Sequence, residues 1–292
     1  MLTSSASLSA QQLSRQLTIG TLIASDLRVI RSPVGNMLVL TGTDGPLVVG
    51  PPEPELIVRA RRLLSALRTP RPKYALIIAS DSAVRRRDGG WGRAGALAMM
   101  QEGARLRMRF TAPDTTLPAD IPTIGFSDVL QLSVDSEEIH IVHQPAGFSD
   151  TDVSVHFEVR HVMYLGNLFT TDGYPSIDVL RGGTIGGLIQ ASSKILDMFS
   201  PHPEVIKVIV PGRGPLANLP ELRAYRDMLL RTRERVDSLL KVTGDNIPKV
   251  VAAHPTRDYD ARWGHGAVTP DRFVEMVGAS LAADRKRNTA NQ

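Results

Sequence analysis

The chain contains no cysteine and few aromatic residues. None of its 292 residues is a cysteine, which excludes disulfides, thiolate metal sites and cysteine nucleophiles. Phenylalanine, tryptophan and tyrosine together make up 5% of the residues, so little is available for stacking on nucleic-acid bases. No apolar run approaches the roughly 20 residues that a membrane-spanning helix needs, and the N-terminus lacks a signal-peptide pattern. These absences favour a cytoplasmic protein without a membrane partner.

Positive charge is in modest excess and is spread along the chain. Lysine and arginine total 34 against 30 aspartates and glutamates, a formal net charge of +4. The densest basic segments, 59–73 and 226–241, also carry leucines at helical spacing, which is typical of solvated helix faces. Nucleic acid is therefore the weakest of the partner classes that we consider.

Short strands and turns dominate the first half of the chain. Residues 35–50 indicate a hairpin, 73–80 a buried strand, 94–104 a helix, and 123–166 four strands of period two. Each half has strands followed by helices, which predicts an α/β protein with two mixed β-sheets flanked by helices, a four-layer αββα sandwich. Further helices are expected at 52–68, 183–199, 219–242, 247–253 and 270–283, with a strand at 205–212.

No linker or low-complexity segment divides the chain. We therefore expect residues 1–16 to form a polar N-terminal arm and residues 17–292 to form one domain. The helix expected at 219–242 carries leucines and a methionine on one stripe and charges elsewhere. Because such a stripe can be buried against a second subunit, we expect a homodimer.

Five segments occur in the order found in the metallo-β-lactamase fold superfamily. From about residue 35 to its end, the chain resembles the hydrolase branch that carries yPfiD, PGHGP and WG motifs. The resemblance implies the αββα fold and, in the family, a dinuclear metal site that makes hydroxide for hydrolysis. The segments are NMLVLTGTDGPLVVG (36–50), MYLGNLF (163–169), YPSIDVLRGG (174–183), VPGRGP (210–215) and RWGHG (262–266).

The resemblance breaks down at the metal ligands. Zinc and iron in such a site need imidazole nitrogens and carboxylate oxygens, and an arginine cannot lose its proton to become a ligand. We therefore expect a degenerate member with neither metal nor cofactor. The family's ligand positions fall on Ser82, Val84, Arg86, Arg87, Phe148, Asn167 and Arg213.

Two other kinds of site are disfavoured by residue spacing. The remaining histidines and acids near the expected cleft lack ligand spacing, and His140 and His143 fall on opposite faces of one strand. Serine catalysis needs a positioned base, and the chain has no G-x-S-x-G elbow. The residues considered are His143, Asp150, Asp152, Asp172 and His265 for a metal, and Ser80, Ser82 and Ser149 for a nucleophile.

Arginines replace histidines in two loops that the fold brings together. Arg86 and Arg87 lie in one loop and Arg213 in the other. Guanidinium groups suit carboxylate and phosphate, so these arginines either bind an anionic small molecule or pair with internal carboxylates such as Asp150. The two roles do not exclude each other.

The sequence thus predicts a metal-independent protein whose former metal cleft is an arginine-lined pocket for an anionic small molecule. Two functions stay open: an enzyme of the hydrolase, lyase or isomerase type, or a non-catalytic pseudoenzyme acting as a binding, regulatory or scaffold subunit. Candidate catalytic residues are Asp150, Asp172, Tyr174 and His265, and candidate ligand-binding residues are Ser82, Arg86, Arg87, Phe148, Asn167, Asp178 and Arg213.

Overall fold

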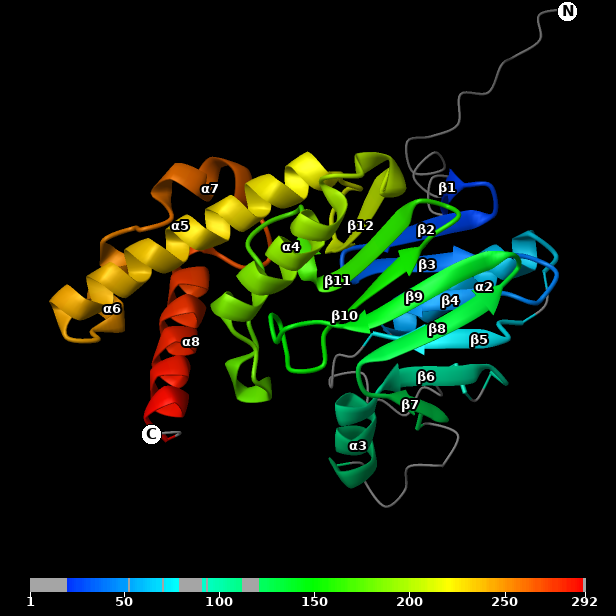
Figure 1. Ribbon diagram of the computed structural model, residues 1–292, viewed down its shortest axis with the longest axis horizontal. Helices are drawn as coiled ribbons and strands as arrows, with labels where there is room; N and C mark the ends of the chain where they lie inside the picture. The colour runs from blue at the N-terminus through cyan, green and yellow to red at the C-terminus, as the bar shows by residue number, and fades with distance from the viewer. Residues whose placement is uncertain are drawn as a thin grey trace, which may run out of the picture.

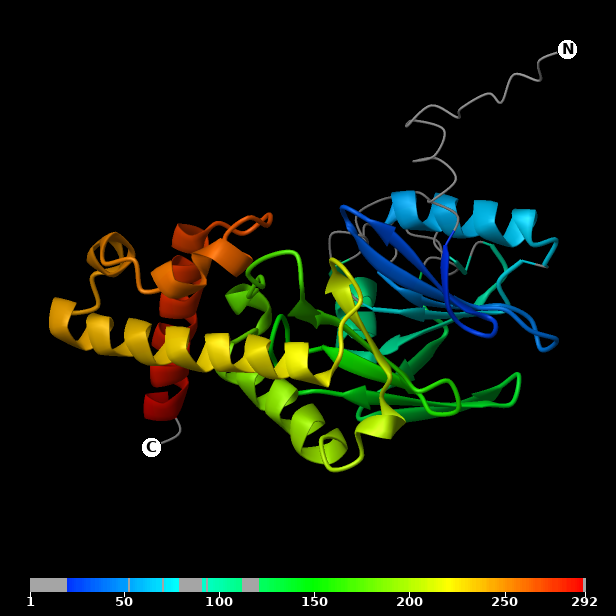
Figure 2. The ribbon, with the colours of Figure 1, turned by 90° about the horizontal axis from the view of Figure 1, so that it is seen from above.

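Two β-sheets pack face to face, and helices cover their outer faces (Figures 1 and 2). A computed structural model describes residues 20–51, 53–69, 71–78, 91–92, 94–111 and 121–290. Helix α2 (Pro54–Ala66) packs on one sheet and helix α4 (Ile185–Phe199) on the other. The predicted αββα sandwich is confirmed. The predicted arm, residues 1–16, lies outside the described residues, and the assignment of one domain stays a prediction.

The first sheet has seven described strands, which follow one another in space in the order of the chain. Its first four strands are antiparallel, and the fourth to seventh are parallel. Helix α2 makes the crossover between the fourth and fifth strands, as parallel neighbours require. The strands are β1 (Thr21–Ala24), β2 (Leu27–Ser32), β3 (Gly35–Leu40), β4 (Leu47–Gly50), β5 (Tyr74–Ile77), β6 (Leu97–Gln101) and β7 (Ile124–Phe126).

The second sheet has five described strands. Four form an antiparallel meander. The fifth pairs in parallel with the last strand of that meander and forms an edge of the sheet. Alternating burial along the ninth strand shows one face turned to the core and the other outward. The strands are β8 (Val129–Val134), β9 (Glu137–His143), β10 (Val153–Phe157), β11 (Val162–Thr170) and β12 (Val208–Arg213).

One segment differs from its prediction. Residues 94–104 were expected to form a helix, but Leu97–Gln101 is strand β6, and helix α3 (Glu102–Thr111) begins only after it. A short, continuously apolar run fits a buried strand and a buried helix equally well. The neighbours decide here, because β6 pairs in parallel with β5 on one side and β7 on the other.

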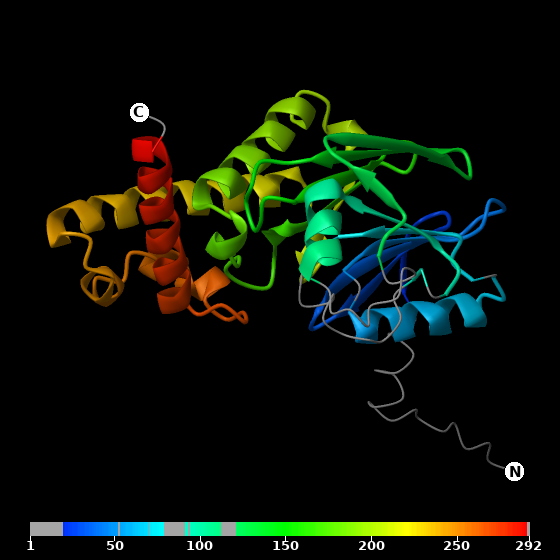
Figure 3. The same ribbon diagram turned by 90° about the horizontal axis from the view of Figure 1, so that it is seen from below.

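The C-terminal helices extend beyond the sandwich, where α5 runs past α4 and α8 packs across it (Figures 1 and 3). The apolar stripe of α5 is buried within the chain against α4 and α8. The homodimer stays a prediction, but this stripe is not available to a partner. None of the described helices has the length and apolar character needed to cross a membrane. The helices are α5 (Leu219–Thr243), α6 (Ile247–Ala252), α7 (Arg257–Trp263) and α8 (Pro270–Ala290).

Buried hydrogen bonds join the two sheets at the end where the site lies. Asn36 on β3 is 1% exposed, and its amide donates to the carbonyl oxygens of Pro211 (2.8 Å) and Gly214 (3.0 Å). The hydroxyl of Tyr164 on β11 donates to the carbonyl oxygen of Asn36 at 3.1 Å. A Cβ at Gly212 would lie 2.4 Å from the carbonyl oxygen of Gly166, so only glycine allows β12 this close to β11. These contacts fix the end of β12.

Candidate functional site

A cavity of about 200 Å³ lies where the ends of several strands meet. Its wall includes Ile78, which follows β5, Phe148 from the loop after β9, Asn167 on β11 and Arg213 at the end of β12. Three of these residues, Phe148, Asn167 and Arg213, occupy positions where the family resemblance expects metal ligands. The structure therefore brings together three residues that are up to 65 positions apart in the chain.

Part of the predicted site lies outside the described residues. Ser82, Arg86 and Arg87 belong to the segment 79–90, whose structure is not described. The described chain stops at Ile78 in the wall of the cavity and continues at Trp91. The pairing of Arg87 with Arg213 therefore stays a prediction.

Arg213 carries the positive charge of the described cavity wall. Its side chain is 28% exposed, and its Nε lies 3.9 Å from Oδ1 of Asp172. The same Asp172 oxygen accepts a hydrogen bond from the Thr170 hydroxyl. Within the described part of the chain, the guanidinium of Arg213 has no other ion pair and no side-chain hydrogen bond. Its N–H donors are therefore left to solvent or to a ligand.

Asp152 holds the loop that carries Phe148. Its carboxylate accepts hydrogen bonds from the backbone N–H groups of Gly147, Phe148 and Ser149 at 2.6–3.1 Å and from the Ser149 hydroxyl at 3.1 Å. Burial raises the pKa of Asp152 to about 7, although these hydrogen bonds act in the opposite direction. In the sequence Asp152 is only one acid among several, because the N–H and hydroxyl groups that donate to it come together only in the folded loop.

Asp150 and Asp178 pair with arginines outside the cavity wall. The Asp150 carboxylate accepts two hydrogen bonds from Arg107 on α3, at 2.7 and 3.0 Å. Asp150 was expected to pair with the cleft arginines, but it pairs with Arg107 and not with Arg213. Asp178 pairs with Arg181 at 2.6 Å, and its backbone N–H donates to the carbonyl oxygen of Phe148 at 2.9 Å. Asp178 thus supports the Phe148 loop from outside the cavity.

Tyr174 and His265 do not line the cavity. Tyr174 is fully buried, its hydroxyl donates to Oδ1 of Asp260 at 2.7 Å, and its ring stacks on Phe273 at 4.7 Å. Burial raises the pKa of Tyr174 well above its usual value, and the bond to Asp260 adds to the effect. His265 is exposed in the loop between α7 and α8. These placements give Tyr174 a structural role and leave Asp172 as the candidate acid next to Arg213.

Ser149 and His143 are also engaged in hydrogen bonds within their own loop. The buried Ser149 hydroxyl contacts Asp152 and Thr151, and Nε2 of His143 lies 2.8 Å from the carbonyl oxygen of Asp150. His140 interacts instead with Glu158 at 2.9 Å. The structure therefore supplies no serine–histidine pair among these residues.

The residues of the cavity do not fit the family's dinuclear metal centre. Phe148 offers no donor atom, Arg213 is permanently cationic, and Asn167 offers one neutral carbonyl oxygen. Over the described ranges, no group of three or more histidine, aspartate or glutamate side chains is arranged to hold a metal ion. The segment 79–90 contains two acids but no histidine or cysteine.

Comparison by sequence identifies no relative. No protein-family model and no curated protein matches the chain.

Solved structures with this fold superpose on most of the chain. A metallo-β-lactamase from Pontibacter korlensis matches with a TM-score of 0.58 and 16% identity over 72% of this chain and 98% of its own. The DIM-1 metallo-β-lactamase matches with a TM-score of 0.54 and 12% identity over 70% and 91% of the two chains.

A third neighbour covers the C-terminal helices as well. A double mutant of the sec-alkyl sulfatase PisA1 matches with a TM-score of 0.58 and 13% identity over 91% of this chain. The chain spans about half of the sulfatase, because the match covers 51% of that protein. At these identities the similarity establishes architecture and not activity. The chain has the metallo-β-lactamase fold. Of its three described ligand positions, Phe148 and Arg213 carry side chains that cannot ligate a metal, and Asn167 offers one neutral carbonyl oxygen.

Proposed function

We propose that this protein binds a small anionic molecule, without a metal, in the cavity between Phe148, Asn167 and Arg213. The observation that carries the proposal is the state of Arg213: a partly exposed guanidinium in a cavity wall, whose one described ion pair is 3.9 Å long. A guanidinium presents several N–H donors to a carboxylate or phosphate.

The other walls are of mixed character. Asn167 contributes an amide that both donates and accepts hydrogen bonds, and Ile78, Phe148 and Phe169 contribute apolar surface. Glu53 adds a carboxylate, which is engaged in an interaction of its own, so the anionic end of a ligand belongs on the side of Arg213. A volume of about 200 Å³ is below the range of about 300–1,000 Å³ that is usual for drug-sized ligands. Small carboxylates and inorganic phosphate are the classes of this size and charge.

The choice between catalyst and pseudoenzyme depends on Asp172. It is the one candidate proton-transfer residue in contact with Arg213, since Tyr174 is bonded to Asp260 and Asp150 to Arg107. Binding without catalysis needs only Arg213 and its neighbours, so we place the binding function first. The enzyme alternative requires Asp172 to act on the bound anion. A cytoplasmic location stays a prediction.

Calorimetric titration with acetate, malonate and inorganic phosphate tests the proposal. We expect saturable binding of at least one anion, and Arg213→Met should weaken it about tenfold or more, because hydrogen bonds to charged groups contribute roughly 1.5–3 kcal/mol. Arg213→Lys should retain part of the affinity. Arg231→Met, which removes an exposed arginine from α5, is the matched control and should change nothing. Equal affinity in wild type and Arg213→Met would show that the cavity is not an anion site.

A further inference from the structure

The seven-stranded sheet extends beyond the edge of the five-stranded sheet. Strand β12 is the edge of the smaller sheet and contacts β3, whereas β2 and β1 continue past it. A second cavity, of about 350 Å³, lies in this overhang between the inner face of β1 and β2 and the segment that follows β12. Because Val29 belongs to the core between the sheets, Arg31, two positions along the same strand, faces the same side.

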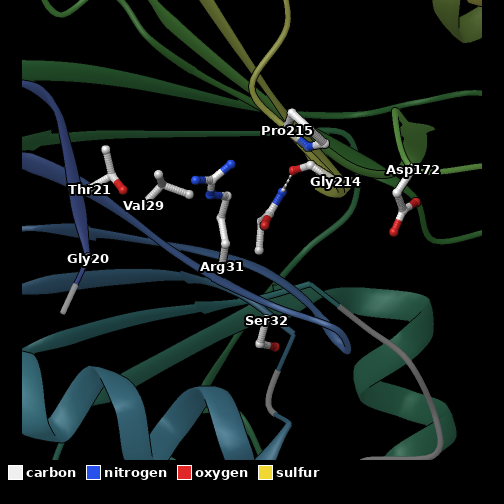
Figure 4. Close-up of a pocket in the computed structure, with 9 residues that line it drawn as sticks. Gly20, Thr21, Val29, Arg31, Ser32, Asp172, Gly214 and Pro215 are labelled. Carbon is white, nitrogen blue, oxygen red and sulfur yellow. Dashed lines mark hydrogen bonds between the residues drawn. The ribbon is translucent and has the colours of Figure 1, made fainter. Parts of the chain in front are cut away.

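The walls of this second cavity carry opposite charges. Arg31 extends from β2 toward the segment with Gly214 and Pro215, and Asp172 lies beyond that segment (Figure 4). Among the described residues, Arg31 has no side-chain hydrogen bond or ion pair, and its guanidinium and the Asp172 carboxylate are not paired with each other. Asp172 is 40% exposed, and its only described ion pair is the 3.9 Å approach of Arg213. Both charges are therefore open to a ligand.

The segment between the two charges is fixed in place. Asn36 is buried, and its amide holds the carbonyl oxygens of Pro211 and Gly214. A Cβ at Gly214 would lie 2.7 Å from the backbone nitrogen of Asp172 and 2.4 Å from the Thr171 hydroxyl, so the Gly214 segment packs tightly against the start of the Asp172 loop. The backbone contacts thus fix the Gly214 segment and the start of the Asp172 loop, whereas the exposed Arg31 side chain can adjust to the length of a ligand.

We propose that this second cavity binds a zwitterion: a small molecule with an ammonium group for Asp172 and a carboxylate for Arg31. An ω-amino acid is the simplest member of that class. The site is distinct from the proposed anion cavity, and the two are linked through Asp172, which pairs with Arg213. A bound ammonium group competes with Arg213 for Asp172.

A homologous series of probes tests the proposal. Glycine, β-alanine, 4-aminobutyrate and 5-aminopentanoate carry the same two charges at increasing separation, and butyrate and butylamine carry one charge each. Near pH 7 all the amino groups and carboxyl groups are ionised. We expect one or two members of the series to bind, by calorimetry and saturation-transfer NMR, about tenfold or more tighter than either singly charged probe.

Variants assign the probe to the cavity. Arg31→Met and Asp172→Asn should each weaken the best zwitterion about tenfold, while Arg231→Met should leave its affinity unchanged. Arg213→Met should strengthen it, because Asp172 is then released from its ion pair. Thermal unfolding of each variant confirms that the fold is intact.

Three results would overturn the proposal. The first is that no zwitterion exceeds the singly charged probes up to about 10 mM. The second is full binding to Arg31→Met. The third is binding that is lost in Arg213→Met but kept in Arg31→Met, which would place the probe in the anion cavity. Failure here leaves the anion proposal standing, since that proposal depends on Arg213 and not on Arg31.

Discussion

At the scale of single residues, the site is defined by what has replaced the metal ligands. Phe148 and Arg213 remove donor atoms, while Arg213 keeps positive charge in the cleft without Lewis acidity. Asp172 is placed to modulate that charge, because its carboxylate is the one described ion-pair partner of Arg213 and also lines the second cavity. One carboxylate thus lies beside Arg213 and also in the wall of the second cavity, so it connects the two binding sites that we propose.

The pKa of Asp152 predicts a pH dependence of stability. Burial raises the pKa of Asp152 to about 7 from the ordinary value of an aspartate near 3.8, so between these values the folded chain holds a proton that the unfolded chain has lost. Unfolding free energy should therefore fall as the pH rises from about 4 to 7, by up to about 4 kcal/mol. Urea unfolding of wild type and Asp152→Asn across this range measures the effect. The fall should be absent in Asp152→Asn, in which the lowered pKa of partly buried His156 makes stability rise with pH instead. Parallel curves for the two proteins would show that Asp152 is ionised throughout.

At the scale of secondary-structure elements, the site depends on how β12 is held against β3. Asn36→Ala removes the donor for two carbonyl oxygens, those of Pro211 and Gly214. We expect the free energy of unfolding to drop by about 2–3 kcal/mol, because buried acceptors would lose their partner. The affinity for an anion should fall as well, because Arg213 lies between Pro211 and Gly214 in the chain. Ser133→Ala, on the exposed face of β8, is the control. Unchanged stability of Asn36→Ala would mean that the two sheets are held together elsewhere.

The elements that the sequence reveals are those with a strong local period. The four strands at 123–166 were predicted from their period of two, which the burial of β9 follows. Strand β6 (Leu97–Gln101) was not predicted, because it is identified only by its neighbours β5 and β7. The site divides in the same way. The family resemblance predicted that Phe148, Asn167 and Arg213 would meet. It did not predict the partners of Asp150 and Tyr174, which lie 43 and 86 residues away along the chain. No local pattern specifies such pairs.

At the scale of the whole molecule, Tyr174 connects the sandwich with the C-terminal helices. Its hydroxyl donates to Asp260 on α7, and its ring stacks on Phe273 of α8. Tyr174→Phe should keep the stacking and lose the hydrogen bond, which lowers the free energy of unfolding by about 1–3 kcal/mol. Anion affinity should stay within about twofold of wild type. Melting temperature and anion titration test the two parts. Loss of anion binding with unchanged stability would show instead that Tyr174 takes part in the binding site.

A crystal structure of the protein soaked with arsenate, an analogue of phosphate, and recorded at the arsenic absorption edge tests the anion cavity. Arsenic marks the ligand by its anomalous signal, and its oxygens should lie within hydrogen-bond distance, about 2.7–3.2 Å, of the Arg213 guanidinium, with Asn167 and Phe148 beside them. The expected result is one arsenic peak in this cavity and no metal peak. A cavity filled by protein side chains, or one or two metal ions bound between these loops, would contradict a metal-independent anion site.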